Sequence, residues 1–314
     1  MRSGVAALLA TLILLSARPA GAAGHCDADR IAVTVLGSGG PELDDGRASS
    51  GYLFELDGVA RILIDAGSGT ALNFERAGAR FESLAAILLT HLHVDHSVDL
   101  PSFVKAAYFS ERERDLPVLG PPGNAGVPAL DAWLRTLFAA PDGAYRYLSE
   151  YLDPEAAAAF KLRPHVVDLP LPETVDGPHR TYRHRLDGLA LTATRVHHGP
   201  IPALAWRIEV AGCAVVFSGD TSNRLHGLDA LARGADLLIA HNAVPEGAAG
   251  SARALHMPPS EIGRIAQDGD VGRLLLSHRM QRTLGREAET VAAIRRHYPG
   301  PVAFAEDGAR YPLR

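Results

Sequence analysis

The sequence predicts an α/β fold in which two β-sheets pack face to face and helices cover their outer surfaces. Three observations predict it: short β-branched segments that end at Gly or Asp, helical segments interspersed among them, and a second half that repeats the alternation of the first. The chain has 314 residues, 47% of them apolar, so it is long enough for one large or two small domains with a substantial core. Periodicity alone leaves open which α/β architecture forms.

The expected elements follow one another in a regular order. In the first half we expect strands at residues 31–36, 51–56, 61–64 and 85–89, followed by helices at 100–114 and 131–137. In the second half we expect strands at residues 189–195, 203–210, 214–217, 236–240 and 273–276. Helical segments at 227–233, 260–268 and 287–297 lie between or after these strands. Residues 141–185, rich in Pro, Tyr and Arg, are expected to form an irregular insertion or lid.

The first 22 residues have the three parts of a secretory signal peptide. Arg2 precedes an apolar run at residues 5–15, and Ala20-Gly21-Ala22 follows as a small-residue cleavage site. The apolar run is shorter than the roughly 20 residues that cross a bilayer. We therefore expect a periplasmic or secreted protein whose mature domain, residues 23–314, has no membrane span.

Two cysteines, Cys26 and Cys213, remain in the mature chain. An oxidising compartment outside the cytosol permits a disulfide between them. Their positions in the sequence leave two interpretations open, a disulfide or two unpaired apolar side chains.

Residues 91–96 hold three histidines and one aspartate directly after an apolar run. In His91-x-His93, on a loop after a strand, both imidazoles can reach one cation, and Asp95 and His96 follow on the next turn. Nitrogen ligands with one carboxylate and no thiolate suit Zn²⁺, with Mn²⁺ or Fe as substitutes. A solvated loop is the alternative, but with only 14 His in the chain such a cluster rarely arises by accident. The cluster therefore predicts a metal site.

Four motifs, taken in order along the chain, resemble the signatures of the metallo-β-lactamase superfamily. They are Leu63-Ile64-Asp65-Ala66-Gly67, Thr90-His91-Leu92-His93-Val94-Asp95-His96, Ser218-Gly219-Asp220-Thr221 and Leu276-Ser277-His278. The resemblance extends from about residue 31 to residue 312. It implies an αββα sandwich, two β-sheets packed face to face with helices outside and the metals at one edge of the sheets.

The resemblance also implies ligands for two zinc ions. The implied ligands are His91, His93, Asp95, His96, His198, Asp220 and His278. Asp220 would bridge the two ions, and Asp65 would hold the N–H of a ligand imidazole. The third histidine of the first zinc is His197 or His198, because alternation along a strand lets only one of them face the metals. The spacing to the following strand resembles the family better with His198.

Two divalent cations about 3.5–4 Å apart activate a shared water and bind both the attacked and the leaving oxygen, so the site predicts a hydrolase. Motifs at residues 36–40, 117–123 and 205–207 resemble the ribonuclease Z and arylsulfatase-like branch. Three features favour a substrate other than tRNA. They are the signal peptide, the short segment between His198 and Asp220 where the family carries a long tRNA-clamping arm, and the formal net charge of −5.

Two further histidines are candidates for proton transfer. The His-Glu-Ala-Thr motif of ribonuclease Z-like proteins corresponds to His241-Asn242-Ala243-Val244 here, so its Glu is absent. We expect His256 to protonate the leaving group, a step worth roughly 10²–10⁴-fold in rate, or else to lie on the surface and cap the helix near Ser260. His241 is expected near the site, or else in the core. Asp95 is counted with these two histidines as a catalytic residue as well as a ligand.

The sequence as a whole predicts an exported di-zinc hydrolase that cleaves a small anionic ester, a phosphodiester or an aryl sulfate, with a hydroxide shared by the metals. Three alternatives remain: a lactonase or β-lactam hydrolase, a ribonuclease Z-like endonuclease, and a non-catalytic metal-binding protein. No nucleic-acid partner is expected, and whether the chain forms a homodimer stays open. The stretch Tyr182-Arg183-His184-Arg185, in the expected lid, either contacts the anionic substrate or is an ordinary solvated face.

Overall fold

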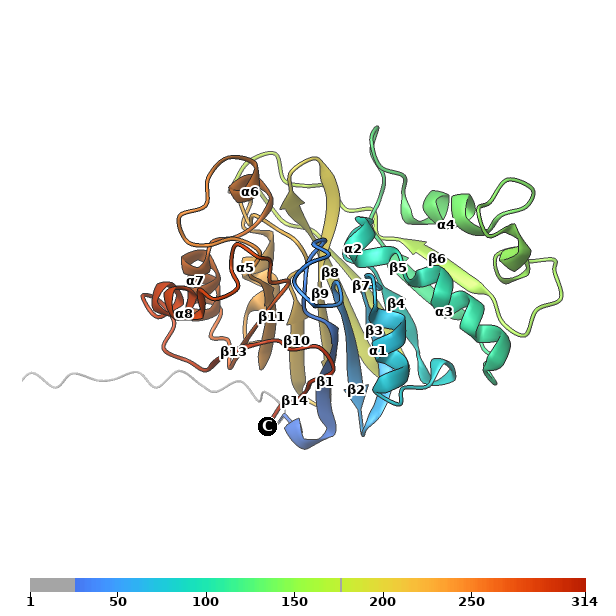
Figure 1. Ribbon diagram of the computed structural model, residues 1–314, viewed down its shortest axis with the longest axis horizontal. Helices are drawn as coiled ribbons and strands as arrows, with labels where there is room; N and C mark the ends of the chain where they lie inside the picture. The colour runs from blue at the N-terminus through green and yellow to red at the C-terminus, as the bar shows by residue number, and fades with distance from the viewer. Residues whose placement is uncertain (1–25, 176) are drawn as a thin grey trace, which may run out of the picture.

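The computed structural model describes residues 26–175 and 177–314, so the predicted signal peptide, residues 1–22, lies outside the described residues. Two seven-stranded sheets pack face to face, and helices cover both outer surfaces (Figure 1). The αββα sandwich expected from the sequence is therefore confirmed.

The first sheet is formed by the N-terminal half of the chain and one strand from the C-terminus. Its order is β14-β1-β2-β3-β4-β5-β6. The bounds are β1 Ile31–Gly37, β2 Gly51–Leu56, β3 Val59–Ile64, β4 Ala86–Leu88, β5 Leu116–Gly120, β6 Leu162–Val166 and β14 Arg310–Pro312. The pairs from β14 to β3 are antiparallel, and those from β3 to β6 are parallel.

The second sheet repeats this pattern with the C-terminal half. Its order is β13-β12-β11-β10-β9-β8-β7. The bounds are β7 Thr181–Leu186, β8 Leu189–His198, β9 Ile201–Val210, β10 Cys213–Phe217, β11 Leu237–His241, β12 Leu274–Ser277 and β13 Val302–Phe304. Strands β7 to β10 pair antiparallel, and β10 to β13 are parallel.

Helices form the two outer layers. Beside the first sheet lie α1 Thr70–Arg76, α2 Val94–Ser97, α3 Leu100–Ala106 and α4 Leu130–Phe138; beside the second lie α5 Gly227–Ala232, α6 Gly250–Leu255, α7 Pro259–Asp268 and α8 Glu287–Ile294 (Figure 1). Short 3₁₀ helices are η1 Ala28–Arg30, η2 Phe81–Ser83, η3 Ala107–Phe109 and η4 Arg146–Tyr151. Apolar side chains fill the space between the sheets, with Phe54, Trp206 and Phe217 at its centre, and separate apolar clusters join each sheet to its helices.

Residues 141–185, expected as an irregular insertion or lid, also contain regular structure. They include β6 and β7, which are the edge strands of the two sheets. The sequence did not show these strands because both are weakly apolar: no side chain of β7 is fully buried, only one of β6 is, and β6 contains Pro164, which an edge strand tolerates. The expected helix at residues 100–114 is also shorter, since regular structure ends with η3.

Cys26 and Cys213 form a disulfide, with their Cα atoms 4.6 Å apart. The bond joins the segment before η1 to the first residue of β10, and it decides between the two interpretations that the sequence left open. Within residues 26–175 and 177–314, no helix combines the length and apolar composition needed to cross a membrane.

The carboxyl ends of parallel strands lie at one edge of each sheet, and here the edges of both sheets meet. Asp65 follows β3, Asp220 follows β10 and His278 follows β12. His198 and His241 are the last residues of β8 and β11. The topology therefore brings residues that are distant in the sequence to one place.

Candidate metal centre

The loop between β4 and α2 supplies four of the predicted ligands. His91 and His93 lie on the loop itself, whereas Asp95 and His96 belong to α2. Because α2 begins directly after His93, the short helix turns the last two side chains toward the edge of the second sheet. All four side chains follow β4, in the order that the sequence spacing indicates.

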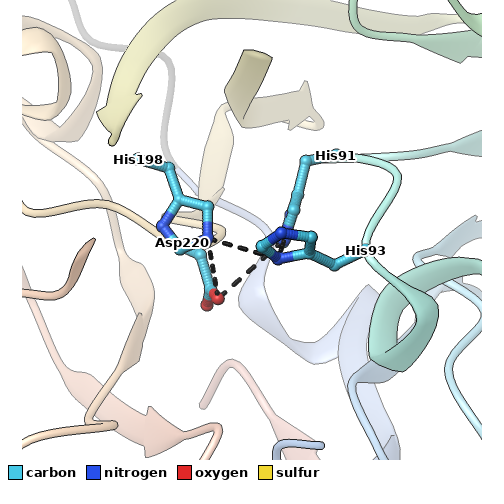
Figure 2. Close-up of side chains that lie close together, drawn as sticks. All are labelled: His91, His93, His198 and Asp220. Carbon is cyan, nitrogen blue, oxygen red and sulfur yellow. Dashed lines mark hydrogen bonds and ion pairs between the residues drawn. The ribbon is translucent and has the colours of Figure 1, made fainter. Parts of the chain in front are cut away.

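His91, His93, His198 and Asp220 form a first group of ligand atoms (Figure 2). Nδ1 of His93 lies 3.0 Å from Nε2 of His91 and 3.4 Å from Nε2 of His198. The ligands of a tetrahedral zinc ion at about 2.0–2.1 Å are roughly 3.4 Å apart, so the three nitrogens have the separation that one zinc requires. Asp220 Oδ2 lies 3.6 Å from His198 Nε2 and supplies a fourth ligand.

A second group of ligands lies on the other side of Asp220. His278 Nε2 is 3.3 Å from both Asp95 Oδ2 and Asp220 Oδ1, and His96 Nε2 is 3.5 Å from Asp95 Oδ2 and 3.7 Å from Asp220 Oδ2. The Nε2 atoms of His96 and His278 are buried and have no hydrogen-bond partner among the residues that the structure describes. Buried polar atoms normally have a partner, so two such nitrogens facing two carboxylates fit a cation.

Unusual backbone conformations also occur at the edge of the sheets where the ligands lie. Asp65 and His278 have positive φ angles of 57° and 53°, in the left-handed region that residues other than Gly rarely adopt. Such conformations cost about 1–3 kcal/mol and occur mainly at functional sites. Gly40 packs so closely on the His278 ring that an added Cβ would lie 2.9 Å from its Cε1. The Gly-rich turn after β1 therefore makes room for the ring of a predicted ligand.

Hydrogen bonds hold the ligand rings in place from behind. Asp65 Oδ2 lies 2.7 Å from His96 Nδ1, as expected from the sequence, and it also accepts a bond from the Thr90 hydroxyl. Nδ1 of His198 lies 2.9 Å from the carbonyl oxygen of Leu255. In His96 and His198 one nitrogen is thus fixed by the protein and Nε2 faces the centre, whereas His93 faces it with Nδ1.

His197 takes no part in either group. Its Nδ1 lies 2.8 Å from the Ser222 hydroxyl, on the side of β8 opposite to His198. Of the two adjacent histidines, the structure therefore places His198 among the ligands.

His241 is buried beside Asp220 but does not face a cation. Its Nδ1 lies 2.7 Å from Asp220 Oδ1, and its Nε2 lies 3.1 Å from the hydroxyl of Tyr52. The Tyr52 hydroxyl is also 2.7 Å from the Ser277 hydroxyl. Both nitrogens of His241 thus contact neighbouring side chains, so it positions Asp220, and a ring nitrogen of His241 also lies within 4.8 Å of the ligand atoms of His96 and His278. Tyr52 carried no signal in the sequence, and Ser277 stood out only as the neighbour of His278 in the last motif.

His256 lies at the centre and not on the surface. It follows α6 directly and is only 7% exposed, and its Nδ1 is 3.9 Å from Asp220 Oδ2. Burial lowers the pKa of His256 to about 3, so its ring is neutral at neutral pH. Asn242, the residue after His241, donates from its side chain to the Val244 carbonyl, and its Oδ1 has no partner among the described residues.

The electrostatic field of the carboxylates favours positive charge at the second group of ligands. Burial alone would lower the pKa of His96, but Asp95, Asp65 and Asp220 outweigh it and raise that pKa to about 10. Burial alone would likewise raise the pKa of Asp220, but His278 and its neighbours hold it well below its usual range. Both carboxylates of the centre are therefore ionised, as metal ligands must be.

A family model described as Beta-lactamase superfamily domain matches residues 60–279. The chain belongs to the metallo-β-lactamase superfamily. Proteins of this superfamily typically bind metal ions, which agrees with the two ligand groups. Among its relatives, ribonuclease Z of Mycolicibacterium paratuberculosis is 31% identical over 290 residues, covering 88% of this chain and 96% of that protein. This match places the chain in the ribonuclease Z branch of the superfamily.

Solved structures share the fold of this metallo-β-lactamase superfamily member. The metallo-β-lactamase fold protein YhfI from Bacillus subtilis has a TM-score of 0.67 at 24% identity and covers 90% of this chain and 100% of its own. The short form of human tRNase Z has a TM-score of 0.67 at 21% identity, with 90% and 99% covered. The predicted superfamily and its ribonuclease Z-like branch are confirmed, and the chain is a hydrolase of this fold.

Proposed function

We propose that this hydrolase is a di-zinc phosphodiesterase that cleaves RNA. The observation that carries the proposal is the position of Asp220. Its Oδ2 lies 3.6, 3.7 and 3.9 Å from the Nε2 atoms of His198, His96 and His91, so a single carboxylate serves both ligand groups. A carboxylate shared in this way is what a two-metal hydrolytic site uses to hold its ions together.

Zinc ions bound there would supply Lewis acidity and a water that ionises near neutral pH. The residues of the chain do the rest. Asp220, held by His241, sets the separation of the two groups of ligands. The neutral ring of His256 accepts the proton that the attacking water gives up and passes it to the leaving oxygen, which keeps the proton count balanced.

The named relatives support RNA phosphodiester bonds, rather than the other esters, as the substrate. From the sequence alone we expect a small anionic ester first and a ribonuclease Z-like endonuclease as an alternative, and the named relatives favour that alternative. The match covers 96% of the mycobacterial protein and 88% of this chain, so it extends over nearly the whole of both.

Export remains part of the proposal. The signal-like residues 1–22 and the disulfide between Cys26 and Cys213 both support a periplasmic or secreted enzyme. In that compartment the substrate would be RNA outside the cytosol, and a small phosphodiester is the second candidate. The aryl sulfate, lactone and β-lactam substrates have no further observation in their favour.

The test is a substrate panel with the purified, zinc-loaded protein. We expect about two zinc ions per chain and hydrolysis of single-stranded RNA, pre-tRNA and bis(p-nitrophenyl) phosphate, with little turnover of an aryl sulfate, a lactone or a cephalosporin. His91→Ala, which removes a ligand, serves as the blank. Zinc near zero per chain with no recovery on adding zinc, or turnover confined to the sulfate, lactone or cephalosporin, would overturn the proposal.

A further inference from the structure

A hollow of about 420 Å³ lies on the outer face of the second sheet, beside α5 and away from the metal centre. We call it the arginine hollow; its walls are Arg183, Arg185, Arg207 and Arg233, and its floor is Ala190, Thr192 and Thr194. Thr192 and His198 are both in β8, and six residues of strand put them roughly 20 Å apart at about 3.3 Å per residue. The hollow is thus a separate feature that lies within reach of a long substrate.

Strand register explains why a hollow forms here. Thr192 of β8 is paired with Arg183 of β7 on one side and with Arg207 of β9 on the other. Paired residues point to the same face, so two long side chains flank one short side chain. Two strand spacings of about 4.8 Å place the Cβ atoms of Arg183 and Arg207 about 10 Å apart. Helix α5 covers only part of this face, and Arg233, its C-cap, closes one side.

The charges around the hollow are not balanced. Glu209 is the only carboxylate among its lining residues, and it is already paired with Arg207 at 2.9 Å. Arg183, Arg185 and Arg233 form no ion pair with any residue that the structure describes. Like charges gathered on one face of a sheet are unfavourable unless an anion joins them. This cluster is unusual in a chain whose formal net charge is −5.

We propose that the arginine hollow binds backbone phosphates of a single-stranded RNA whose cleavage point lies at the metal centre. The inference rests on the proposed phosphodiesterase function. Guanidinium groups bind phosphate oxygens in a bidentate manner, and Arg183 and Arg185, two residues apart on one face of β7, are spaced by about 7 Å, which suits two successive phosphates. Arg207 already donates to the carbonyls of Leu231 and Arg233 and to Glu209, so it forms a wall of the hollow. The hollow is open and its free arginines lie along β7 and at the end of α5, which suits a continuous backbone better than an enclosed small anion. It also gives the Arg183-His184-Arg185 stretch a role away from the expected lid.

The first test measures binding without cleavage. In a His91→Ala background, Arg183→Ala with Arg185→Ala is compared with Arg76→Ala with Arg135→Ala, which removes the same charge from α1 and α4 beside the other sheet. A labelled single-stranded RNA of about a dozen nucleotides is titrated at several salt concentrations. We expect about tenfold weaker binding for the first pair, and a salt-dependence slope that is smaller by about 0.7 for each arginine removed. The control pair should change neither.

The second test measures turnover in the zinc-loaded protein. Replacing Arg183 and Arg185 by Ala should raise the KM for the RNA about tenfold and leave its kcat unchanged, while hydrolysis of bis(p-nitrophenyl) phosphate, too small to reach the hollow, stays the same. If no phosphodiester is cleaved, the proposed function fails, and the binding experiment still decides the role of the hollow. Equal RNA binding by the two double variants would overturn the inference. So would equal competition by inorganic pyrophosphate and by the RNA, since the hollow would then be a small-anion site.

Discussion

Asp220 and His241 are joined by a buried hydrogen bond of 2.7 Å between Oδ1 of the carboxylate and Nδ1 of the ring. An ionised carboxylate can only accept, so Nδ1 carries the proton. Burial lowers the pKa of His241 to about 4, so the ring is neutral, and its Nε2 lies 3.1 Å from the Tyr52 hydroxyl, which also contacts the Ser277 hydroxyl at 2.7 Å. Asp220 therefore sets the tautomer of His241, and Tyr52 holds the opposite side of the ring that orients the carboxylate shared by both ligand groups.

Tyr52→Phe is expected to weaken zinc binding by about tenfold or more with little change in packing. Groups that orient metal ligands typically contribute 10–100-fold in metal affinity, and this substitution removes one hydroxyl and no carbon. Competition with a chromophoric chelator measures the affinity directly, so the result does not depend on catalysis.

The matched control for Tyr52 is Tyr298→Phe. Tyr298 is also buried, but it follows α8 in the chain. Its hydroxyl donates to the Val271 carbonyl and takes no part in the metal centre. Tyr52→Phe loses two buried hydroxyl contacts and Tyr298→Phe loses one, so both should lose stability, and only the first should lose zinc affinity. Equal zinc affinity in the two variants would show that Tyr52 is simply a core tyrosine.

His198→Ala and His197→Ala are expected to have clearly different effects on zinc content and hydrolysis. His198 contributes Nε2 to the first ligand group, whereas His197 contacts only Ser222. Removing His198 should abolish most of the hydrolysis and release close to one zinc per chain. Removing His197 should leave the hydrolysis rate and the zinc content within about twofold of the wild type. Zinc content by elemental analysis and initial rates on bis(p-nitrophenyl) phosphate check this. The reverse pattern would mean that β8 shifts in register in the metal-loaded protein.

The sequence predicted those parts of the centre that depend on local spacing. His91, His93, Asp95 and His96 are recognisable because they follow one strand within a single loop and a helical turn. The motif around Asp220 is equally local. The role of Asp65 also followed, because a carboxylate at a strand end close to ligand histidines usually holds one of them.

The parts that depend on distant pairing could not be predicted. Tyr52 and His241 are 189 residues apart, and β2 reads as an ordinary buried strand. The three-residue strands β13 and β14 are too short to show periodicity. The sequence indicates a lid around the arginines of β7 because this edge strand is rich in polar residues and none of its side chains is fully buried. Only the strand register with β8 and β9 shows that those side chains line one hollow.

His256→Ala should reduce the rate according to the leaving group. For RNA, whose leaving alkoxide needs a proton, we expect a loss of about 10²–10⁴-fold in kcat; for bis(p-nitrophenyl) phosphate, whose leaving phenolate is stable, the loss should be less than about tenfold. His297→Ala, at an exposed position beyond α8, is the control and should change neither rate. The same loss on both substrates would assign His256 to metal binding or substrate positioning instead of proton transfer.

Replacing Cys26 and Cys213 together by Ala is expected to lower the free energy of unfolding by about 2–4 kcal/mol. The disulfide connects residues 187 positions apart, so it constrains a long stretch of the unfolded chain, and the sulfur atoms lie beside the core between the sheets. Urea denaturation of the metal-free protein, followed by circular dichroism, measures the change.

A reductant provides the matched comparison for the disulfide. Treating the wild-type protein with dithiothreitol should bring its urea midpoint down to that of the double variant, while the midpoint of the variant itself should not move. Because Cys26 and Cys213 lie at the opposite end of β10 from Asp220, zinc content and hydrolysis under native conditions should be the same with and without the bond. A variant as stable as the oxidised wild type would mean that the two cysteines are not joined in the folded protein. It would also remove one of the two observations that support export.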